Sequence, residues 1–347
     1  MRYLTAGESH GRGLVAILEG LPAGLKIDVG FINAELKRRQ MGFGRGKRMQ
    51  IESDTALIVS GVKNNKSLGS PLALLIENKD FSIEKLHKVL CPRPGHADLA
   101  GFLKYGFSDI RECLERASAR STAATVGVGA VCKLFLNEFK ITVASKVVSI
   151  GGAVAHEERI NKIKQAIENK DTLGGIFEVI AENMPVGLGS YVHPDRRLDC
   201  RLAGAVMAIP GIKGVEIGLG FGYADKLGSE VHDPIYYSQS RGYSRSTNNA
   251  GGIEGGISNG EDIVLSACMK PISTLMKPLA SVNVQTKKSS LAATERSDTC
   301  AVESAGVVAE SVCAYVLVEA LLEKFGSDCL TDIKANYQGY LKRIKKF

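Results

Sequence analysis

The 347-residue sequence contains no tryptophan, and only 6% of its residues are aromatic. Few rings are therefore available for stacking nucleobases, which disfavours a protein that binds single-stranded nucleic acid. No stretch without Lys, Arg, Asp or Glu is longer than twelve residues, the length of 121–132, whereas a bilayer-spanning helix needs about 20 predominantly apolar residues. The first residues also lack the apolar core of a secretory signal. These absences predict a cytoplasmic protein with no membrane partner.

Motifs for metals, disulfides and common nucleotides are missing as well. None of the eight cysteines forms a C-x-x-C pair, and several lie in apolar segments, which predicts small buried thiols rather than disulfides or zinc ligands. No His and carboxylate spacing predicts a metal site. The sequence has neither the phosphate loop G-x-x-x-x-G-K-[ST] nor the dinucleotide pattern G-x-G-x-x-G after a strand, which argues against a P-loop NTPase and a dinucleotide-binding Rossmann domain.

Positive charge is present in mild excess, with 44 Lys and Arg against 37 Asp and Glu. One interpretation is a surface for RNA or DNA, helped by the basic tail at 342–347; the other is a set of arginines gathered around a small polyanion. The arginines stand among Gly, Ser, His and Asp rather than in a basic stripe with aromatic residues. This distribution favours a compact anionic ligand and no nucleic acid, because the guanidinium fork matches phosphate and carboxylate groups.

The hydrophobic pattern mixes helices with strands. Strands are predicted at 143–150, 177–181 and 262–269, where apolar and β-branched residues dominate. Helices are predicted at 108–120, at the interior segment 121–136, at the amphipathic surface segment 156–169 and at 301–325, where glutamates separate apolar positions. No composition change marks a domain boundary. We therefore expect a single domain over 1–347 with a basic helical tail at about 327–347.

A short internal echo joins two distant segments. Residues 20–25 read Gly-Leu-Pro-Ala-Gly-Leu, and residues 183–188 read Asn-Met-Pro-Val-Gly-Leu. The echo is compatible with two related halves or with a turn that recurs. Because six residues are few, the sequence favours the recurring turn.

Two histidines differ from the rest by their neighbours. His10 lies in the segment Gly7-Glu-Ser-His-Gly11, and His96 lies in Pro92-Arg-Pro-Gly-His-Ala-Asp98. Proline and glycine fix the backbone around His96, which suits a positioned proton donor or acceptor. The alternative for either histidine is a turn residue with a local hydrogen bond.

Seven segments together resemble the chorismate synthase family, and they occur in the family's order between residues 7 and 300. They are Gly7-Glu-Ser-His-Gly11, Arg93-Pro-Gly-His-Ala-Asp98, Arg116-Ala-Ser-Ala-Arg120, Lys213-Gly-Val-Glu-Ile-Gly218, Ala250-Gly-Gly-Ile-Glu-Gly-Gly-Ile-Ser-Asn-Gly260, Lys270-Pro-Ile-Ser-Thr274 and Arg296-Ser-Asp-Thr-Cys300.

The resemblance implies a fold and a reaction. The fold would be an α+β sandwich of the β-α-β type, with a helical layer between antiparallel sheets, assembled as a homotetramer. The reaction would be the last step of the shikimate pathway, a 1,4-anti-elimination of phosphate from 5-enolpyruvylshikimate 3-phosphate that gives chorismate. The family uses reduced FMN (FMNH2) for this lyase reaction without net redox change.

The resemblance also implies roles for individual residues. His10 would protonate the leaving phosphate, His96 would keep the flavin N1 region protonated, and Asp298 would help to remove the C6 proton. The residues implied in substrate binding are Arg39, Arg45, Arg93, Ser118, Arg120 and Arg296. The residues implied in FMN binding are Arg116, Ala117, Ser118, Gly255, Lys270, Pro271, Ile272, Ser273, Thr274 and Arg296.

Two departures from the family pattern bear on function. Where the family commonly has Arg-His-Asp-Pro-Cys, this chain has Ser297 and Thr299 in place of His and Pro, while Asp298 remains. Some members reduce their own flavin with NADPH, but this sequence shows no separate nicotinamide (NADP) module, so we expect a separate flavin reductase or another source of reduced flavin. The alternatives are a different flavin- or phosphate-dependent lyase, and a basic nucleic-acid-binding protein.

Overall fold

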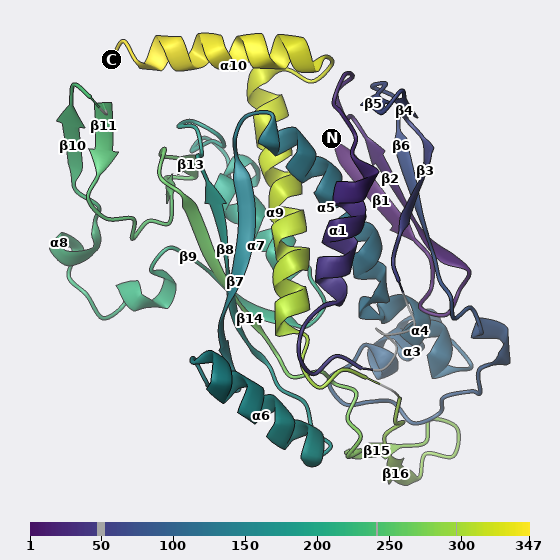
Figure 1. The fold of residues 1–347 in the computed structure, drawn as a ribbon. Helices are drawn as coiled ribbons and strands as arrows, with labels where there is room; N and C mark the ends of the chain where they lie inside the picture. Colours follow the sequence, from purple (N-terminus) through teal and green to yellow (C-terminus); the bar gives the residue numbers. More distant parts are fainter. Residues whose placement is uncertain (47–52, 241, 296) are drawn as a thin grey trace.

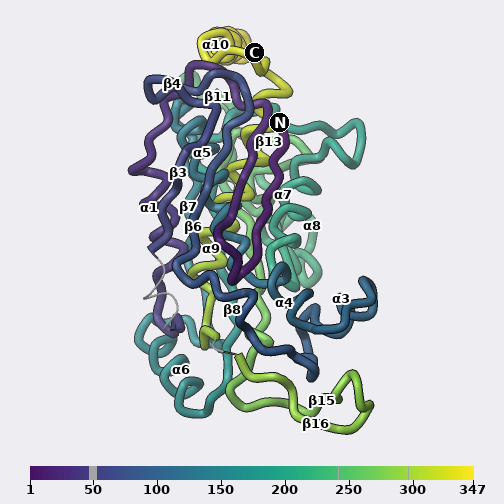
Figure 2. The backbone as a smooth tube through the Cα atoms, turned by 90° about the vertical axis from the view of Figure 1, so that its right-hand side faces the viewer, coloured from purple at the N-terminus to yellow at the C-terminus, as the bar shows by residue number. Residues whose placement is uncertain are grey.

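Two antiparallel sheets enclose a layer of helices (Figure 1). The computed structural model describes residues 1–46, 53–240, 242–295 and 297–347. Figure 1 shows the first sheet to the right of the long helices and the second sheet to the left, and Figure 2, turned by 90°, shows the first sheet in front of the helices. This arrangement confirms the predicted α+β sandwich.

The first sheet contains four antiparallel strands in the order β1-β2-β6-β3. Their bounds are β1 Arg2–Ala6, β2 Gly13–Glu19, β3 Ala56–Ser60 and β6 Leu72–Glu77. Alternate residues of β2 and β6 are buried against the helices, as expected for strands with one face on a core.

The second sheet repeats this order as β7-β8-β14-β9, again antiparallel. Its strands are β7 Thr142–Ile150, β8 Gly175–Glu182, β9 Ile212–Ile217 and β14 Ile263–Met269. The three strands predicted at 143–150, 177–181 and 262–269 are β7, β8 and β14, so those predictions are confirmed.

The helical layer consists of α1 Val29–Gln40, α5 Thr122–Asn137, α7 Leu198–Met207 and α9 Val302–Phe325. Helices α1 and α5 pack on the first sheet, α7 and α9 pack on the second, and α5 crosses α9 between them. The predicted helix at 121–136 is confirmed as α5, and its interior position follows from thirteen buried residues. The predicted helix at 108–120 is shorter, because α4 Ile110–Ala117 ends where Ser118 becomes extended and its side chain accepts a hydrogen bond from the Arg120 amide.

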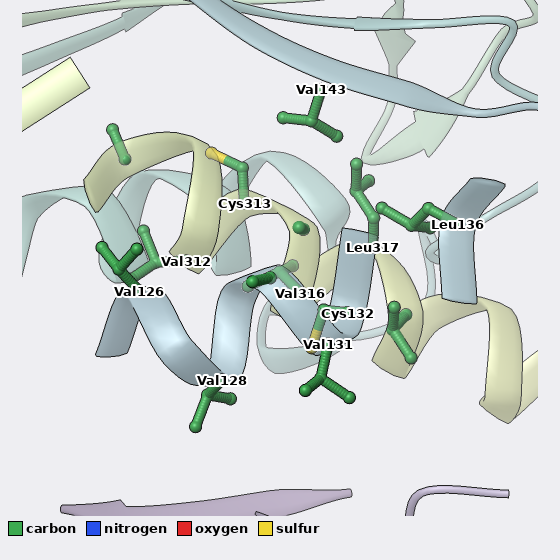
Figure 3. Packing of buried hydrophobic residues seen from close by; sticks show 14 of the residues in the cluster. Val126, Val128, Val131, Cys132, Leu136, Val143, Val312, Cys313, Val316 and Leu317 are labelled. Atoms are coloured by element: carbon green, nitrogen blue, oxygen red, sulfur yellow. The ribbon is translucent and has the colours of Figure 1, made fainter. Parts of the chain in front are cut away.

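Helix α9 is the centre of the core. Its length and apolar composition would suffice for a membrane span, but 89% of its most apolar window is buried inside the protein, as in a core helix. Valine, leucine and cysteine side chains of α5 and α9 interlock there (Figure 3). The helices approach closely at Gly129, where a Cβ would lie 2.1 Å from the side chain of Ser311.

A buried ionic cluster crosses the helical layer. Lys133 of α5 lies 2.5 Å from Glu35 of α1 and also bonds Glu310 of α9, whose carboxylate accepts further bonds from Arg38 and Ser145. Burial alone would raise the pKa of Glu310, but Arg38 and Lys133 lower it below its usual value. The glutamate spacing in 301–325 did not reveal this cluster, because Glu310 is fully buried rather than solvated.

The echo between residues 20–25 and 183–188 belongs to a larger repeat. Each segment follows the second strand of its sheet and precedes a layer helix. The Leu25 amide donates to Ser67 Oγ, which donates to Pro22 O; likewise, the Leu188 amide donates to Ser258 Oγ, which donates to Pro185 O. The predicted turn does recur, and it stands at the same place in two halves that share one strand order.

The remaining elements lie outside the two sheets and the helical layer. Helix α6, at His156–Glu168, confirms the predicted surface helix, and α10 follows α9 across one end of the molecule (Figure 1). Four of the cysteines are buried, whereas Cys200 and Cys268 are exposed, so the prediction of buried thiols was wrong for those two. The other bounds are β4 Val62–Lys63, β5 Lys66–Ser67, α3 Asp98–Tyr105, α8 Gly228–Val231, β10 Ile235–Ser238, β11 Gly242–Arg245, β12 Ile253–Glu254, β13 Ile257–Ser258, β15 Ala280–Val282, β16 Ser289–Leu291 and α10 Leu330–Ile344.

Candidate active site

The predicted site residues gather at the end of the sandwich opposite α10, where connectors from both halves meet (Figure 1). The β6–α5 connector, residues 78–121, runs beside the β14–α9 connector, residues 270–301. The Val284 amide donates to Leu90 O, the Ala293 amide donates to Cys91 O, and Ser281 Oγ donates to Pro92 O. Helices α5 and α9 both begin at this end, and helix N-termini favour anions.

His10 follows β1 and is held by a carboxylate from α4. Its Nδ1 lies 2.9 Å from Oε1 of Glu115, and its backbone amide donates to Oε2 of Glu115 at 2.8 Å. Burial alone would raise the pKa of Glu115, but hydrogen bonds from His10 and the charge of Arg111 lower it. An ionised carboxylate only accepts hydrogen bonds, so Nδ1 carries the proton in this contact.

Asn78, just after β6, joins the His10 turn to a buried arginine. Its Nδ2 donates to the carbonyl oxygen of Gly11 at 2.7 Å and contacts two further carbonyls of the same turn. Its Oδ1 accepts from Nε of Arg120 at 2.9 Å. Beside this junction, Ser118 Oγ lies 3.2 Å from Ser9 Oγ. Asn78 thus fixes His10 and Arg120 relative to each other.

Two buried arginines share one buried carboxylate. Arg39 Nη2 and Arg120 Nη1 donate to Oδ2 of Asp54 at 2.9 and 2.8 Å, and Arg39 also contacts Thr122. Burial would raise the pKa of Asp54, but Arg120 and Arg39 lower it. Burial lowers the pKa of Arg39, as do the neighbouring charges of Arg120 and Arg45. Two positive groups therefore face a single negative one.

The arginine cluster has hydrogen-bonding capacity left over. Among the residues that the structure describes, Nε of Arg39 and Nη2 of Arg120 are buried without an acceptor. A buried N–H without an acceptor costs free energy, on the order of 1–3 kcal/mol. A bound anion would satisfy both donors, so the cluster fits a phosphate or carboxylate ligand.

Asp298 pairs with Arg45 across the start of α9. Oδ2 of Asp298 lies 2.7 Å from Nη1 of Arg45, and Oδ1 accepts from the Gly46 amide at 2.6 Å. The Thr299 amide donates to Gly44 O at 2.8 Å, which ties the same two segments together. The structure therefore brings together a predicted catalytic residue and a predicted substrate-binding residue from opposite ends of the chain.

His96 belongs to a second charged group, built on α3. Arg93 donates hydrogen bonds to Asp98 from Nε at 2.8 Å and from Nη2 at 2.9 Å. Its Nη1 donates to Thr274 Oγ1 at 2.7 Å. Nδ1 of His96 lies 2.5 Å from Oδ1 of Asp98 and 3.1 Å from Nη2 of Arg93. Burial opposes ionisation of Asp98, yet His96 and Arg93 hold the pKa of Asp98 well below its usual range. The Nδ1–H of His96 therefore donates to the carboxylate.

The Lys270–Thr274 segment meets the His96 loop at Gly95. Lys270 Nζ and Ser273 Oγ both donate to the carbonyl oxygen of Gly95. Burial and the nearby charge of Lys213 lower the pKa of Lys270. Ile272 is fixed through its own carbonyl oxygen, which accepts from Thr172 at 2.7 Å. Two ammonium groups close together, with no carboxylate paired to either among the described residues, make an electropositive position.

The remaining predicted residues divide between the site and other places. Arg116 and Ala117 end α4, and Arg116 donates to the carbonyl oxygens of Thr5 and Gly7 near the end of β1. Gly255, with a φ of +58°, lies in the turn between β12 and β13, and β13 lies in the half of the molecule that carries α10, away from the connectors of the site (Figures 1 and 2). Arg296 lies outside the described residues.

Three residues that hold the site were missed by the sequence analysis, namely Asp54, Asn78 and Glu115. Asn78 directly follows the apolar strand β6, and Glu115 of α4 precedes Arg116 and Arg120. These positions are the only local sequence signals of their roles. Their partners are 15 to 105 residues away in sequence. In the described part of the chain, no group of three or more His, Cys, Asp or Glu side chains could hold a metal ion.

Comparison with known proteins gives matches over most or all of this chain. The family model of chorismate synthase matches residues 1–322. The chorismate synthases of Thermoanaerobacter pseudethanolicus and Geobacter sulfurreducens are 56% and 51% identical, over all of this chain and all of each relative. A crystal structure of chorismate synthase superimposes with a TM-score of 0.83 at 43% identity, covering 100% of this chain and 98% of that one. The chain therefore belongs to the chorismate synthase family, the lyases that release phosphate from 5-enolpyruvylshikimate 3-phosphate to form chorismate with the help of a reduced flavin.

Proposed function

We propose that the buried arginines and the two carboxylate-held histidines form the active site of this lyase, with FMNH2 as the reduced flavin. The observation that carries the proposal is the pair of buried guanidinium N–H groups on Arg39 and Arg120 that have no acceptor within the described structure. The substrate bears a phosphate and two carboxylates. It supplies the negative charge that this cluster lacks.

Substrate binding is assigned to arginines of α1 and of three connectors. Arg39 and Arg120 converge on Asp54, which fixes both guanidinium planes before a ligand arrives. Arg45 adds a third positive charge, close enough to lower the pKa of Arg39. Preorganised positive charge stabilises a departing phosphate dianion more than it stabilises the bound ester. Ser118 and Arg93 complete the predicted set, and Arg296 is assigned by resemblance alone.

His10 is the proposed proton donor to the leaving phosphate. Glu115 occupies Nδ1, so Nε2 is the ring atom that exchanges a proton with the phosphate oxygen. Asn78 ties the His10 turn to Arg120, which aligns the acid with the anion-binding group. Holding acid and anion in one geometry before the reaction removes part of its entropic barrier.

The flavin position is assigned to the second charged group. When bound, the reduced flavin lends electron density to the substrate as the C–O bond breaks and recovers it afterwards. Lys270 and Lys213 make an electropositive position that fits the flavin phosphate, and Ser273 and Thr274 contribute hydroxyl groups. His96, held by Asp98, presents an imidazole for the flavin N1 region. Arg116, Ala117, Ser118, Pro271 and Ile272 would line the same ligand.

Asp298 is the proposed acceptor in the removal of the C6 proton. Its carboxylate is held by Nη1 of Arg45 at 2.7 Å and by the Gly46 amide at 2.6 Å, which fixes its position at the start of α9. Neither Ser297 nor Thr299 supplies a group that the carboxylate role requires. Substrate binding to Arg45 would compete with Asp298 for the guanidinium, which couples binding of the anion to the position of the carboxylate.

Assembly as a homotetramer is proposed from two features. The outer face of the first sheet carries exposed apolar side chains, among them Leu4, Ile17, Leu57 and Val59, which a second copy would cover. The turn between β12 and β13, which contains Gly255, lies in the half of the molecule that carries α10 (Figures 1 and 2), so another copy of the chain would bring Gly255 to a flavin.

The chain is proposed to fold as one domain over 1–347, since one buried hydrophobic cluster runs from Leu14 to Tyr337 and includes both sheets. Its proposed location is the cytoplasm. The flavin is proposed to arrive already reduced, from a reductase or another donor. Turnover with oxidised FMN and NADPH alone, in the absence of a reductase, would contradict this last point.

The test is an anaerobic assay with dithionite-reduced FMN and 5-enolpyruvylshikimate 3-phosphate, in which chorismate and phosphate are followed together. We expect both products in equal amounts, with no net flavin oxidation. Arg120→Ala should raise KM and lower kcat, whereas the exposed arginine variant Arg2→Ala should match the parent. Normal kinetics for Arg120→Ala, with the fold intact, would refute the assigned anion site.

A further inference from the structure

We propose that Glu115 is a positioning residue that fixes the ring orientation and proton placement of His10. Nothing in the family resemblance assigned a role to Glu115, which lies one residue before the predicted flavin contact Arg116. The inference rests on the proposed role of His10 as the acid that protonates phosphate.

The carboxylate of Glu115 holds His10 at two points. Oε2 accepts from the His10 backbone amide at 2.8 Å, and Nδ1 of the ring lies 2.9 Å from Oε1 and 3.0 Å from Oε2. The main chain of the same residue adds a third link, because Glu115 O accepts from the Ser9 amide at 3.0 Å. Only 3% of the Glu115 side chain is exposed, so water does not compete for these bonds.

Among the described residues, His10 alone forms hydrogen bonds with the Glu115 carboxylate. Among the described Lys and Arg side chains, only Arg111 forms an ion pair with Glu115, and its Nη1 is 3.6 Å from Oε1, beyond hydrogen-bonding distance. Arg111 bonds instead to Glu295 at 2.7 Å and to His87 O at 2.7 Å. Asn78 holds the carbonyl groups of the His10 turn from the opposite side. The His10 turn is therefore held from two sides, by Glu115 and by Asn78. Of these two residues, only Glu115 contacts the imidazole ring.

This contact has a chemical consequence for proton transfer. Nδ1–H is committed to the carboxylate, so the neutral ring presents Nε2 as an acceptor and the charged ring presents Nε2–H as an acid. The same carboxylate, 2.9 Å from the ring, faces the positive charge that the ring carries while Nε2 holds the proton for phosphate. Asp98 stands in the same relation to His96, so both predicted catalytic histidines are held through Nδ1 by a buried carboxylate.

The kinetic test is a double-mutant cycle with Glu115→Gln and His10→Ala, using substrate and reduced FMN. Glu115→Gln alone should lower kcat by about 10- to 100-fold with little change in KM, the scale seen when a group that orients a functional histidine is lost. In the His10→Ala background the same change should lower kcat by less than about twofold, because a residue that acts through His10 has nothing left to act on. Glu112→Gln, an equal charge loss at an exposed position of the same helix, should match the parent in both backgrounds.

A second measurement does not depend on turnover. Nitrogen-15 NMR of histidine-labelled protein, recorded at a pH where the rings are neutral, should place the His10 proton on Nδ1 in the parent. In Glu115→Gln, the amide oxygen is needed by the His10 backbone N–H, so the amide NH2 faces Nδ1 and should move the proton to Nε2. The His10 signal is identified by its absence from the spectrum of His10→Ala.

The outcomes separate this inference from the proposed function. If His10→Ala lowers kcat but Glu115→Gln leaves both kcat and the tautomer unchanged, the positioning role is wrong and the acid role of His10 stands. Equal losses from Glu115→Gln in both backgrounds would also overturn the inference, because they indicate a structural effect. If His10→Ala turns over normally while Glu115→Gln still shifts the tautomer, the acid role is wrong and the positioning contact is correct.

Discussion

The two halves of the molecule share one plan and use it for different purposes. Each has four antiparallel strands in the same order, with a turn held by the same hydrogen bonds to a buried serine. The α1–β3 connector of the first half runs over residues 41–55 and contains Arg45 and Asp54. The equivalent α7–β9 connector of the second half is only residues 208–211 and carries no charge. The strands and helices thus form the scaffold, and the connectors at one end determine the chemistry.

The outer faces of the two sheets differ in the same way. Across the first sheet, Ala6, Val15, Leu75 and Leu57 stand side by side in one row. The equivalent row across the second sheet is Lys146, Glu178, Ser266 and Glu216. An apolar face needs a cover and a charged face does not. The two halves therefore differ in their outer faces and connectors, whereas both bury alternate residues of their central strands against the helices.

The largest effect is expected at the first connector of each half. His10 lies in the β1–β2 connector, whereas the β7–β8 connector carries the exposed His156 of α6. His10→Ala should lower kcat by about 10²- to 10⁴-fold, the range for loss of a general acid. His156→Ala should leave kcat unchanged. Steady-state kinetics with reduced FMN measures both, and comparable losses in the two variants would contradict the assignment of chemistry to the first connector.

The next effect concerns Asp54, for which the α7–β9 connector has no counterpart. Asp54→Asn leaves two buried guanidinium groups without a negative partner, and removing one partner of a buried ion pair costs about 3–5 kcal/mol. Asp28→Asn makes the same charge change at the exposed N-cap of α1, the helix that carries Arg39. It should lower the free energy of unfolding only slightly, because Asn caps a helix as well as Asp. Urea unfolding gives both values. A loss from Asp54→Asn no larger than that from Asp28→Asn would refute the stabilising role.

The Asp54 effect should also depend on pH. The pKa of Asp54 is lowered by folding, so below its usual value of 3.8 the unfolded chain binds more protons than the folded one. Its contribution to stability is therefore complete above that value and is lost as the pH falls through the folded pKa. The difference between parent and Asp54→Asn should shrink on acidification below about pH 4; a constant difference would show that the ion pair is not its source.

Smaller and matched effects are expected at the two turns. Ser67→Ala and Ser258→Ala each remove a buried hydroxyl that accepts from a leucine amide and donates to a proline carbonyl. Each should cost about 1–3 kcal/mol in unfolding free energy, because two buried backbone groups lose their partners. The exposed Ser327→Ala serves as the control. A loss at only one of the two turns would break the proposed equivalence of the halves.

The smallest effect on the isolated chain is expected on the outer faces. Leu57→Glu and Ile176→Glu each place a charge on an exposed strand position, one on each sheet. Neither should disturb the core, but Leu57→Glu should lower the molar mass measured by light scattering, because it charges the apolar face proposed to pack against another copy. Ile176→Glu should keep the parent mass. An unchanged mass for Leu57→Glu would remove the first sheet as an interface.

Much of the fold could be predicted from local pattern, and part of the site as well. The spacing of apolar residues identified the helices at 156–169 and 301–325 and the strands at 143–150, 177–181 and 262–269. The neighbours of His10 and His96 distinguished them from the other histidines. The residues Asp54, Asn78 and Glu115 could not be found in this way, since an isolated Asp, Asn or Glu near the end of an element is ordinary in sequence. Their importance depends on burial and on partners far along the chain.

The sequence by itself determined the periodicity of each element, the rigid loop around His96, and a family resemblance that covers nearly the whole chain. Only the tertiary structure decided which charges share a partner: that Asp54 serves Arg39 and Arg120, that Glu115 holds His10, and that Asp298 meets Arg45. The physical reason is that secondary structure follows from contacts a few residues apart, whereas a buried charge needs a partner that only chain folding can bring within about 3 Å.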